Sequence, residues 1–424
     1  MNWLSACDKP ARVAGALLAF VCIAACGVSD SQSADSGDVR EYRVHYVIRP
    51  AAAAAVVAVE LRLEQPAGLL REISFPEDPN ISDIKGDGEL QTYDGRVRWQ
   101  PPPEGGRLTW RATVHHERGD GTFDALLTND WGIFRMEDII PRARTRTLRG
   151  AESRTTMTFD LPARWTAVSE YSSVSTPIAV DRPGRRFDEP TGWVAVGRLG
   201  VRREDIAGSH VAVAGPLGHG VRRMDILALL NWTLPELNAI LPGRLPRLTI
   251  VSAGKPMWRG GLSAPASFYL HADRPLISEN ATSAVLHEVM HTALGVRPAR
   301  GFDWIAEGLA EYYSIELLRR GQAITEARAE EAFADQLEWS NEADALCRDP
   351  SEAATTALAV TVFAALDREL KKRTGGNAGL DDLLPALANT QVSLESLTRA
   401  ATELAGQKPE TLNIEQLPGC SNMR

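Results

Sequence analysis

The segment His287-Glu288-Val289-Met290-His291 contains the residue types and spacing from which a chemistry can be inferred. Residues 281–294 are rich in helix formers and Gly295 follows them, which predicts a helix ending there. Because residues four apart lie on one face of a helix, His287 and His291 can both reach a single Zn²⁺ ion. Glu288 lies one step around the helix and can address a water molecule beside the metal rather than the metal itself.

A purely structural interpretation treats the two histidines as ordinary polar residues on a helix. The residues around them, among them Val285, Leu286, Val289 and Met290, are apolar and predict that this helix is largely buried. Histidines and a glutamate inside a buried helix need polar partners, because burying an unpartnered polar group costs free energy. A metal ion supplies those partners, so the pattern favours a metal site.

A catalytic zinc ion has three protein ligands and one open position. No histidine follows His291, so a ligand on the C-terminal side must be a carboxylate, and Glu307 is the candidate. Glu307 belongs to a second predicted helix over 303–320, in which Gly308 leaves room for the two helices to approach closely. Glu311 lies one turn further and either accepts a hydrogen bond from a zinc-bound histidine or is an ordinary solvated carboxylate.

These motifs carry a family resemblance. His287-Glu288-Val289-Met290-His291, followed by Trp304-Ile305-Ala306-Glu307-Gly308-Leu309-Ala310-Glu311-Tyr312-Tyr313, resembles the gluzincin metallopeptidases, closest to glycyl aminopeptidases and more distantly to alanyl-aminopeptidase-type enzymes. The resemblance covers roughly residues 41–390 and is specific around 287–313. It implies one zinc ion per chain on His287, His291 and Glu307, with Glu288 as the general base.

The resemblance extends to the substrate region and also departs from the family there. Trp258-Arg259-Gly260-Gly261-Leu262 resembles the glycine-rich substrate loop, which implies a substrate-binding role for Gly260 and Gly261, with Tyr269 beyond them. Ser263 stands where the family has a glutamate that holds the free amine of the substrate. Thr356 stands at the position of the oxyanion tyrosine, so Tyr269, His271, Tyr312 and Tyr313 are considered as substitutes, although structural roles are the alternative.

Length and periodicity predict an α+β fold of several domains. A chain of 424 residues exceeds one compact core at about 100–200 residues per domain. Alternating apolar runs with turn signals predict an N-terminal antiparallel β-sandwich over 41–216. Helical periods follow and predict a C-terminal α-helical region over 321–424, and the family resemblance implies a thermolysin-like zincin catalytic domain over 217–320. Peptide is expected to lie extended along residues 268–271 at an exposed sheet edge.

The first residues have the features of an export signal. Lys9 and Arg12 precede an uncharged apolar run that is too short to span a bilayer. The run ends in Ile23-Ala24-Ala25-Cys26-Gly27, which resembles the bacterial lipobox, so residues 1–26 are predicted to be a lipoprotein signal with lipid on Cys26. A secretory signal without lipidation is the alternative. Residues 27–40 are polar and predict a flexible linker, and the chain is expected at the cell envelope, in an outer membrane facing the periplasm or the cell surface.

Two cysteines, Cys347 and Cys420, lie outside the predicted signal peptide and its lipidation site. An exported protein folds where disulfides persist, so these two residues are predicted to pair. Two separate buried thiols are the alternative. Neither cysteine has a metal-binding CxxC spacing.

The net charge of −9 and the pI of about 5.5 argue against a nucleic-acid partner, which would require a basic face.

Taken together, these features predict a membrane-anchored zinc peptidase that acts on a peptide or protein substrate. A zinc-peptidase fold of little activity that binds a peptide or an envelope partner is the main alternative. A structural zinc that only joins two helices is a third. The sequence does not specify an oligomeric state.

Overall fold

The computed structural model describes residues 40–421 except 52, 54, 172–175 and 182–186. The predicted signal peptide, its lipidation site Cys26 and nearly all of the predicted linker lie outside the described residues. No helix among the described residues combines the length and the apolar character that crossing a bilayer requires.

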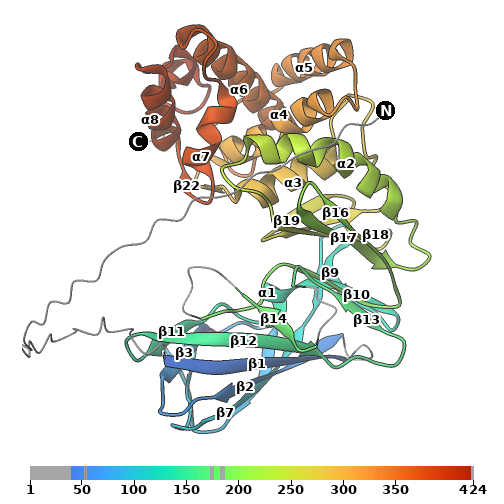
Figure 1. The fold of residues 1–424 in the computed structure, drawn as a ribbon, viewed down its shortest axis with the longest axis vertical. Helices are drawn as coiled ribbons and strands as arrows, with labels where there is room; N and C mark the ends of the chain where they lie inside the picture. Colours follow the sequence, from blue (N-terminus) through green and yellow to red (C-terminus); the bar gives the residue numbers. More distant parts are fainter. Residues whose placement is uncertain (1–39, 52, 54, 172–175, 182–186, 422–424) are drawn as a thin grey trace, which may run out of the picture. The chain divides into compact units, whose positions relative to one another are not determined.

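Two sheets with a common hydrophobic core form the first part of the fold (Figure 1). The first has the strand order β14 (Ile178–Val180), β12 (Ala151–Phe159), β1 (Arg40–Ala51), β2 (Val56–Glu64), β7 (Gly105–Thr113) and β4 (Ile81–Gly86). The second has the order β11 (Arg144–Thr147), β3 (Leu70–Pro76), β6 (Arg96–Gln100) and β5 (Glu89–Tyr93).

Alternation along β1 shows why these strands form: Tyr42, Val44, Tyr46 and Ile48 are buried, whereas Arg43 between them is exposed. The expectation of a purely antiparallel sandwich is wrong for one pair, because β1 and β12 run parallel. A parallel pair needs a long crossover connection, and the chain from β2 to β11 provides it. Alternation within a strand does not reveal this partner.

A third sheet has the order β13 (Thr166–Val168), β15 (Trp193–Gly197), β10 (Trp131–Arg135), β9 (Phe123–Leu127) and β8 (His115–Glu117). A short helix, α1 (Met136–Ile139), follows β10. The buried side chains of Ile133, Trp193 and Ala195 belong to a core shared with the next sheet. The third sheet therefore packs directly against the sheet that leads into the helices.

The fourth sheet has the order β16 (Leu199–Ile206), β17 (Ser209–Pro216), β18 (Arg247–Ala253), β20 (Ser267–His271) and β19 (Gly261–Ala264). The sandwich predicted over 41–216 included the residues of β16 and β17. Strand β16 pairs with β17, and β17 pairs in parallel with β18, which the chain reaches through the crossover helix α2 (Arg223–Ile240). The alternation of a strand predicts its faces and does not predict the sheet that it joins.

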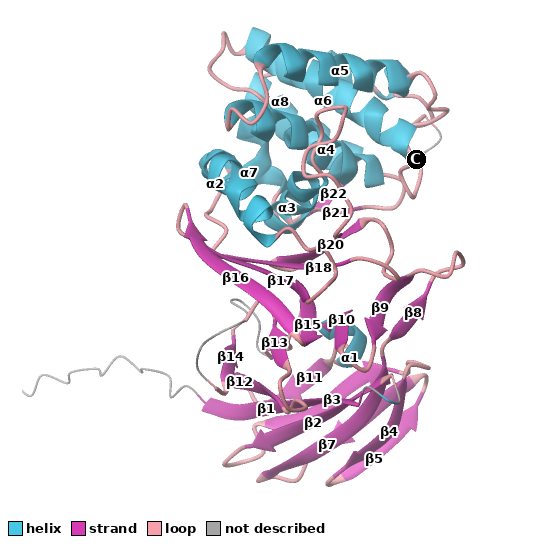
Figure 2. Cartoon of the chain, turned by 90° about the vertical axis from the view of Figure 1, so that its right-hand side faces the viewer, coloured by secondary structure: helices cyan, strands magenta, loops and turns pink. Residues whose placement is uncertain are grey.

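Helices cover one face of this fourth sheet (Figure 2). Helix α2 and helix α3 (Ala284–Leu294) contact the sheet directly. Beyond them pack α4 (Asp303–Arg320), α5 (Glu326–Ser340), α6 (Ala353–Arg373), α7 (Leu384–Leu387) and α8 (Leu394–Ala405). Short elements complete the region: β21 (Arg297–Pro298), β22 (Gln391–Val392), η2 (Leu380–Leu383), η3 (Glu410–Leu412) and η4 (Ile414–Gln416). One apolar core joins the sheet residues Leu248, Ile250, Phe268 and Leu270 to the inner faces of the helices.

A disulfide joins Cys347, between α5 and α6, to Cys420 near the end of the chain, which is the pairing that the sequence analysis predicts. The two residues are 73 positions apart in sequence, so the bond closes a long loop around α6 and α8. Both cysteines are buried. The closed loop restricts the unfolded chain and stabilises the folded helical region.

Replacing both cysteines, as Cys347→Ser with Cys420→Ser, should lower the free energy of unfolding by about 2–4 kcal/mol, because the unfolded chain regains the entropy of an open loop. Guanidinium-induced unfolding followed by circular dichroism measures this change. The unaltered chain under reducing conditions is the control and should unfold at a similarly lower midpoint. Equal midpoints for the oxidised, reduced and substituted chains would contradict the prediction.

Candidate metal centre

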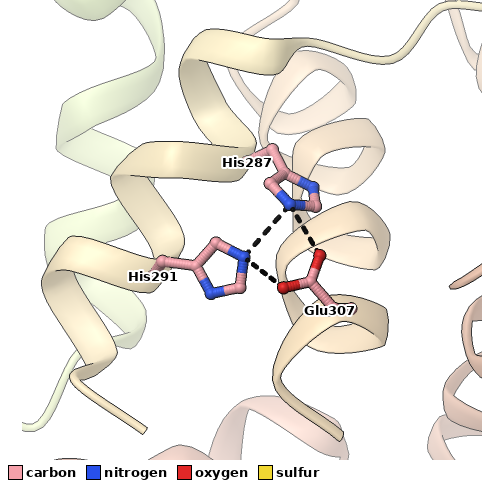
Figure 3. Close-up of side chains that lie close together, drawn as sticks. All are labelled: His287, His291 and Glu307. Carbon is pink, nitrogen blue, oxygen red and sulfur yellow. Dashed lines mark hydrogen bonds and ion pairs between the residues drawn. The ribbon is translucent and has the colours of Figure 1, made fainter. Parts of the chain in front are cut away.

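Two helices supply the candidate metal ligands. Helix α3 begins at Ser283, whose hydroxyl accepts a hydrogen bond from the backbone N–H of Leu286, and ends at Gly295 in the left-handed conformation. One turn separates His287 from His291, so both imidazoles point to the same side of α3 (Figure 3). The neighbouring helix α4 brings Glu307 between them.

Three donor atoms converge at this point. The Nε2 atoms of His287 and His291 are 3.1 Å apart, and each lies 3.2 Å from a carboxylate oxygen of Glu307. In a tetrahedral zinc site with bonds of about 2.0–2.1 Å, neighbouring ligand atoms are about 3.3 Å apart. The three residues also form the one group among the described residues whose His, Cys, Asp or Glu atoms are close enough to hold a metal ion. The donor set therefore fits zinc.

The orientation of His287 is set by Glu311. The Nδ1 atom of His287 lies 2.9 Å from Oε2 of Glu311, one turn after Glu307 on α4. With Nδ1 as the donor to this carboxylate, the lone pair of Nε2 points to the metal centre. Glu311 is largely buried, so the structure favours the orienting role over that of a solvated helix carboxylate.

The ionisation of the metal-free cluster follows from its geometry. Burial by itself would lower the pKa of His287, but hydrogen bonds with Glu307 and Glu311 outweigh burial and raise it well above its usual value. Burial would raise the pKa of Glu307, yet its hydrogen bonds with both histidines leave that pKa far below its usual value. A proton therefore occupies His287 in the metal-free chain, where a cation can replace it.

Glu288 lies beside the three ligands without joining them. Its side chain is buried, and burial raises the pKa of its carboxyl group, partly offset by the two neighbouring histidines. A carboxylate with a raised pKa is better matched to accepting a proton near neutral pH. Arg274, in the loop after β20, is close enough to favour the ionised form, and it is not among the predicted site residues because no motif marks that loop.

Of the two predicted substrate-loop residues, Gly261 lies next to Glu288, whereas Gly260 lies against the ring of Trp258. A Cβ atom added to Gly261 would stand 2.4 Å from Oε1 of Glu288. Such a distance cannot be accommodated unless the carboxylate or the backbone moves. The bare backbone at Gly261 therefore forms the wall against which the Glu288 carboxylate rests.

The structure places several expected residues elsewhere. Tyr269, a tentative substrate residue, points to the face of β20 opposite Phe268 and Leu270, away from α3, and its hydroxyl donates to the carbonyl of Trp258. Successive strand residues alternate between faces, so Tyr269 cannot share the α3 side with Phe268. The expectation that Gly308 lets α3 and α4 approach is also wrong, because its Cβ would instead meet Ala359 of α6.

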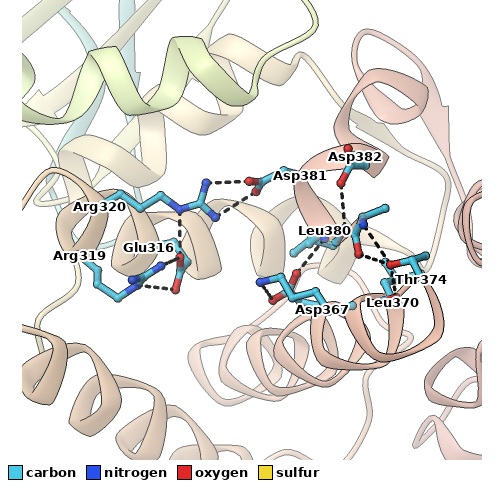
Figure 4. Close-up of polar contacts among 12 residues, drawn as sticks. Glu316, Arg319, Arg320, Asp367, Leu370, Thr374, Leu380, Asp381 and Asp382 are labelled. Atoms are coloured by element: carbon cyan, nitrogen blue, oxygen red, sulfur yellow. Dashed lines mark hydrogen bonds and ion pairs between the residues drawn. The ribbon is translucent and has the colours of Figure 1, made fainter. Parts of the chain in front are cut away.

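Two further tyrosines have structural roles. The hydroxyl of Tyr313 donates to Oδ1 of Asp381 at 2.8 Å, and Tyr312 is buried against Tyr313 and Phe333. Asp381 also receives two hydrogen bonds from the guanidinium of Arg320 (Figure 4). These contacts tie the C-terminal half of α4 to η2, and they hold the helix that carries Glu307 and Glu311.

Glu311→Gln should weaken zinc binding by about 10–100-fold, because the amide orients His287 less strongly than the carboxylate. Competition with a chromophoric zinc chelator measures the dissociation constant. Glu330→Gln, an exposed position on α5, is the matched control and should bind zinc like the unaltered chain. Equal affinities for both variants would show that Glu311 does not orient the ligand.

Zinc binding should also strengthen as pH rises. Hydrogen bonds with two carboxylates, acting against burial, raise the pKa of His287, so a proton must leave before metal binds. We expect the dissociation constant to fall by up to about tenfold per pH unit while one proton is displaced, and to level off above the raised pKa. Chelator competition at several pH values tests this expectation, and a dissociation constant independent of pH would refute it.

Comparison with known proteins places this geometry in a structural context. No protein-family model matches the chain, and no curated protein matches its sequence. The solved structure of an aminopeptidase N family protein from Idiomarina loihiensis has a TM-score of 0.61 at 14% identity, covering 89% of this chain and 74% of that one. An M1 zinc metallopeptidase from Deinococcus radiodurans has a TM-score of 0.55 at 16% identity, covering 88% and 91%. The chain is therefore similar in fold to M1 zinc metallopeptidases.

Proposed function

We propose that the chain is a zinc-dependent metallopeptidase that hydrolyses peptide bonds and is anchored to a membrane of the cell envelope by lipid on Cys26. The observation that supports this most directly is the convergence of His287, His291 and Glu307 beside the buried carboxylate of Glu288. A site that only joined two helices would have no use for such a carboxylate. The fold similarity to M1 zinc metallopeptidases agrees with this proposal.

In the proposed reaction His287, His291 and Glu307 hold the zinc ion, and Glu311 keeps His287 in position. The bound ion would supply Lewis acidity, polarising the scissile carbonyl and lowering the pKa of water towards 7. Glu288 accepts a proton from the attacking water while the oxygen of that water bonds to the carbonyl carbon. Glu288 then delivers a proton to the nitrogen as the carbon–nitrogen bond breaks, so a carboxylic acid and an amine result.

The sheet next to the site offers an edge for an extended substrate. Residues 268–271 were expected to form an exposed edge for peptide, but their strand β20 lies between β18 and β19. Strand β19 ends the sheet order among the described residues and leads directly from the Gly261 wall. A peptide that adds to β19 by main-chain hydrogen bonds would pass beside Glu288.

Ser263 lies on β19 at the position where the resemblance implies an amine-binding glutamate. A neutral hydroxyl does not select a free amino terminus as a carboxylate would. The proposed activity is therefore hydrolysis of peptide bonds by an aminopeptidase-like fold, and it is not assigned to removal of N-terminal residues or to internal cleavage.

A second candidate function is a zinc-containing lipoprotein that binds peptides or an envelope partner without efficient turnover. Its support is that Tyr313 donates to Asp381 and Tyr269 donates to Trp258, so these phenols are engaged away from the metal centre. Loss of one oxyanion donor typically lowers the rate by about 10²–10³. The same zinc site would then serve binding rather than catalysis.

Glu288→Gln separates the two functions. The amide keeps the shape of the side chain and all three metal ligands but cannot accept the proton, so peptide hydrolysis should fall by about 10²–10⁴ while zinc content stays at one per chain. A library of fluorogenic peptides and metal analysis measure the two quantities, with Glu330→Gln as the control. A fully zinc-loaded unaltered chain that cleaves no peptide, or a Glu288→Gln chain of undiminished activity, would refute the peptidase proposal.

A further inference from the structure

The segment that forms the wall beside Glu288 connects two strands of the fourth sheet. It comprises residues 254–261, between the end of β18 and the start of β19, and is called the glycine segment below. The backbone N–H of Met257 donates to the carbonyl of Gly254, and that of Gly260 donates to the carbonyl of Trp258. Both hydrogen bonds join residues within the segment and shape its turns. Contacts with the rest of the fold must therefore fix the position of the segment.

Strand β20 supplies one of those contacts, since the N–H of His271 donates to the carbonyl of Gly260, and a hairpin from the third sheet supplies others. The backbone N–H of Phe123, the first residue of β9, donates to the carbonyl of Pro256 at 3.2 Å. The carbonyl of Phe123 accepts from the N–H of Trp258 at 2.9 Å. Together these bonds make Phe123 and Met257 an isolated parallel bridge, which joins the glycine segment to a sheet far earlier in the chain.

Arg118, in the turn between β8 and β9, covers the Trp258 side chain. Its guanidinium carbon lies 3.9 Å from the centre of the indole ring, and its Nε donates to Oδ1 of Asp124 at 2.6 Å. The other three arginine–aromatic pairs of the described residues are 5.4–5.6 Å apart. The carboxylate thus orients the cation, and the short distance makes this the tightest cation–π contact among them.

Trp258 passes this restraint to the site. Its carbonyl accepts the hydroxyl of Tyr269 at 2.9 Å, which holds the backbone, while Arg118 holds the ring. The ring lies directly over Gly260, where an added Cβ would be only 2.0 Å from it. The next residue, Gly261, contacts Glu288, so packing is continuous from Arg118 to the carboxylate.

We propose that Arg118 is a positioning residue for the candidate active site: by clamping Trp258 it holds the glycine segment against Glu288. The hairpin of the third sheet thereby controls the geometry of the base without contacting the metal ligands. The claim that Arg118 positions Glu288 for catalysis rests on the proposed peptidase function. The claim that Arg118 holds the glycine segment does not depend on that function.

Hydrogen exchange with mass-spectrometric detection tests the clamp. In Arg118→Ala the amides of residues 254–264 should exchange about two- to thirty-fold faster, the range expected for loss of one cation–π contact. Arg118→Lys should restore part of the protection, because an ammonium group keeps the charge without the flat stacking surface. Arg98→Ala removes a looser pair with Tyr93 on a different sheet and is the matched control, expected to leave these amides unchanged.

Kinetics test the positioning of Glu288. The kcat of Arg118→Ala should fall by about two- to thirty-fold at unchanged zinc content, with a smaller change in KM and partial rescue in Arg118→Lys. Asp124→Asn, which releases Arg118 without removing it, should change both exchange and kcat in the same direction. Asp124→Asn therefore also tests the clamp if Arg118→Ala folds poorly.

The outcomes separate the two ideas. Unchanged exchange at residues 254–264 in both Arg118→Ala and Asp124→Asn would overturn the clamp. Faster exchange with unaltered kcat would overturn its role in positioning Glu288. If the unaltered chain hydrolyses no peptide, the proposed function fails by that result, whereas the exchange data still decide whether Arg118 holds the glycine segment.

Discussion

The site depends on one constraint: two imidazole nitrogens and a carboxylate must lie at about the spacing of tetrahedral zinc ligands. Without a cation, the Nε2 atoms of His287 and His291 face each other; burial would lower the pKa of His287, but its hydrogen bonds with Glu307 and Glu311 outweigh burial and raise that pKa. A divalent ion turns this unfavourable arrangement into three bonds. Helices α3 and α4 must therefore keep one relative register, since a shift of one residue would carry Glu307 away from the histidines.

The packing of α4 secures that register. Most of its side chains are buried, from Trp304 near its start to Leu318 near its end, so the helix is enclosed and cannot rotate without exposing apolar surface. Gly308 allows α6 to approach closely, and the hydrogen bonds of Tyr313 and Arg320 to Asp381 fasten the far end. A ligand on such an element is held more accurately than one on a loop. The polar cluster at Asp381 thus supports chemistry that occurs elsewhere on the same helix.

The sheets contribute the other side of the site. Helix α3 lies over the fourth sheet, whose glycine segment meets Glu288, and the third sheet reaches that segment through Phe123 and Arg118. The similarity to M1 zinc metallopeptidases extends over most of the chain, and at 14–16% identity it describes this arrangement of backbone elements. The proposed chemistry is inferred from the side chains themselves. His287, His291, Glu307 and Glu288 agree with the pattern of the resemblance, whereas Ser263 and Thr356 occupy the positions where it implies a glutamate and a tyrosine.

The sequence by itself determined the features that depend on neighbours along the chain. His287, Glu288 and His291 share one helix, so their spacing alone sets their relation. The absence of a later histidine required a carboxylate as the next ligand, and the resemblance implied that it is Glu307. Tertiary structure decided the rest. The membership of β16 and β17 in the fourth sheet, the direction of Tyr269 and the contact of Gly308 with α6 all depend on which distant element packs alongside. Arg118 and Trp258 are 140 positions apart by their numbers, and only the folded chain brings them together, because local periodicity carries no information about partners so remote.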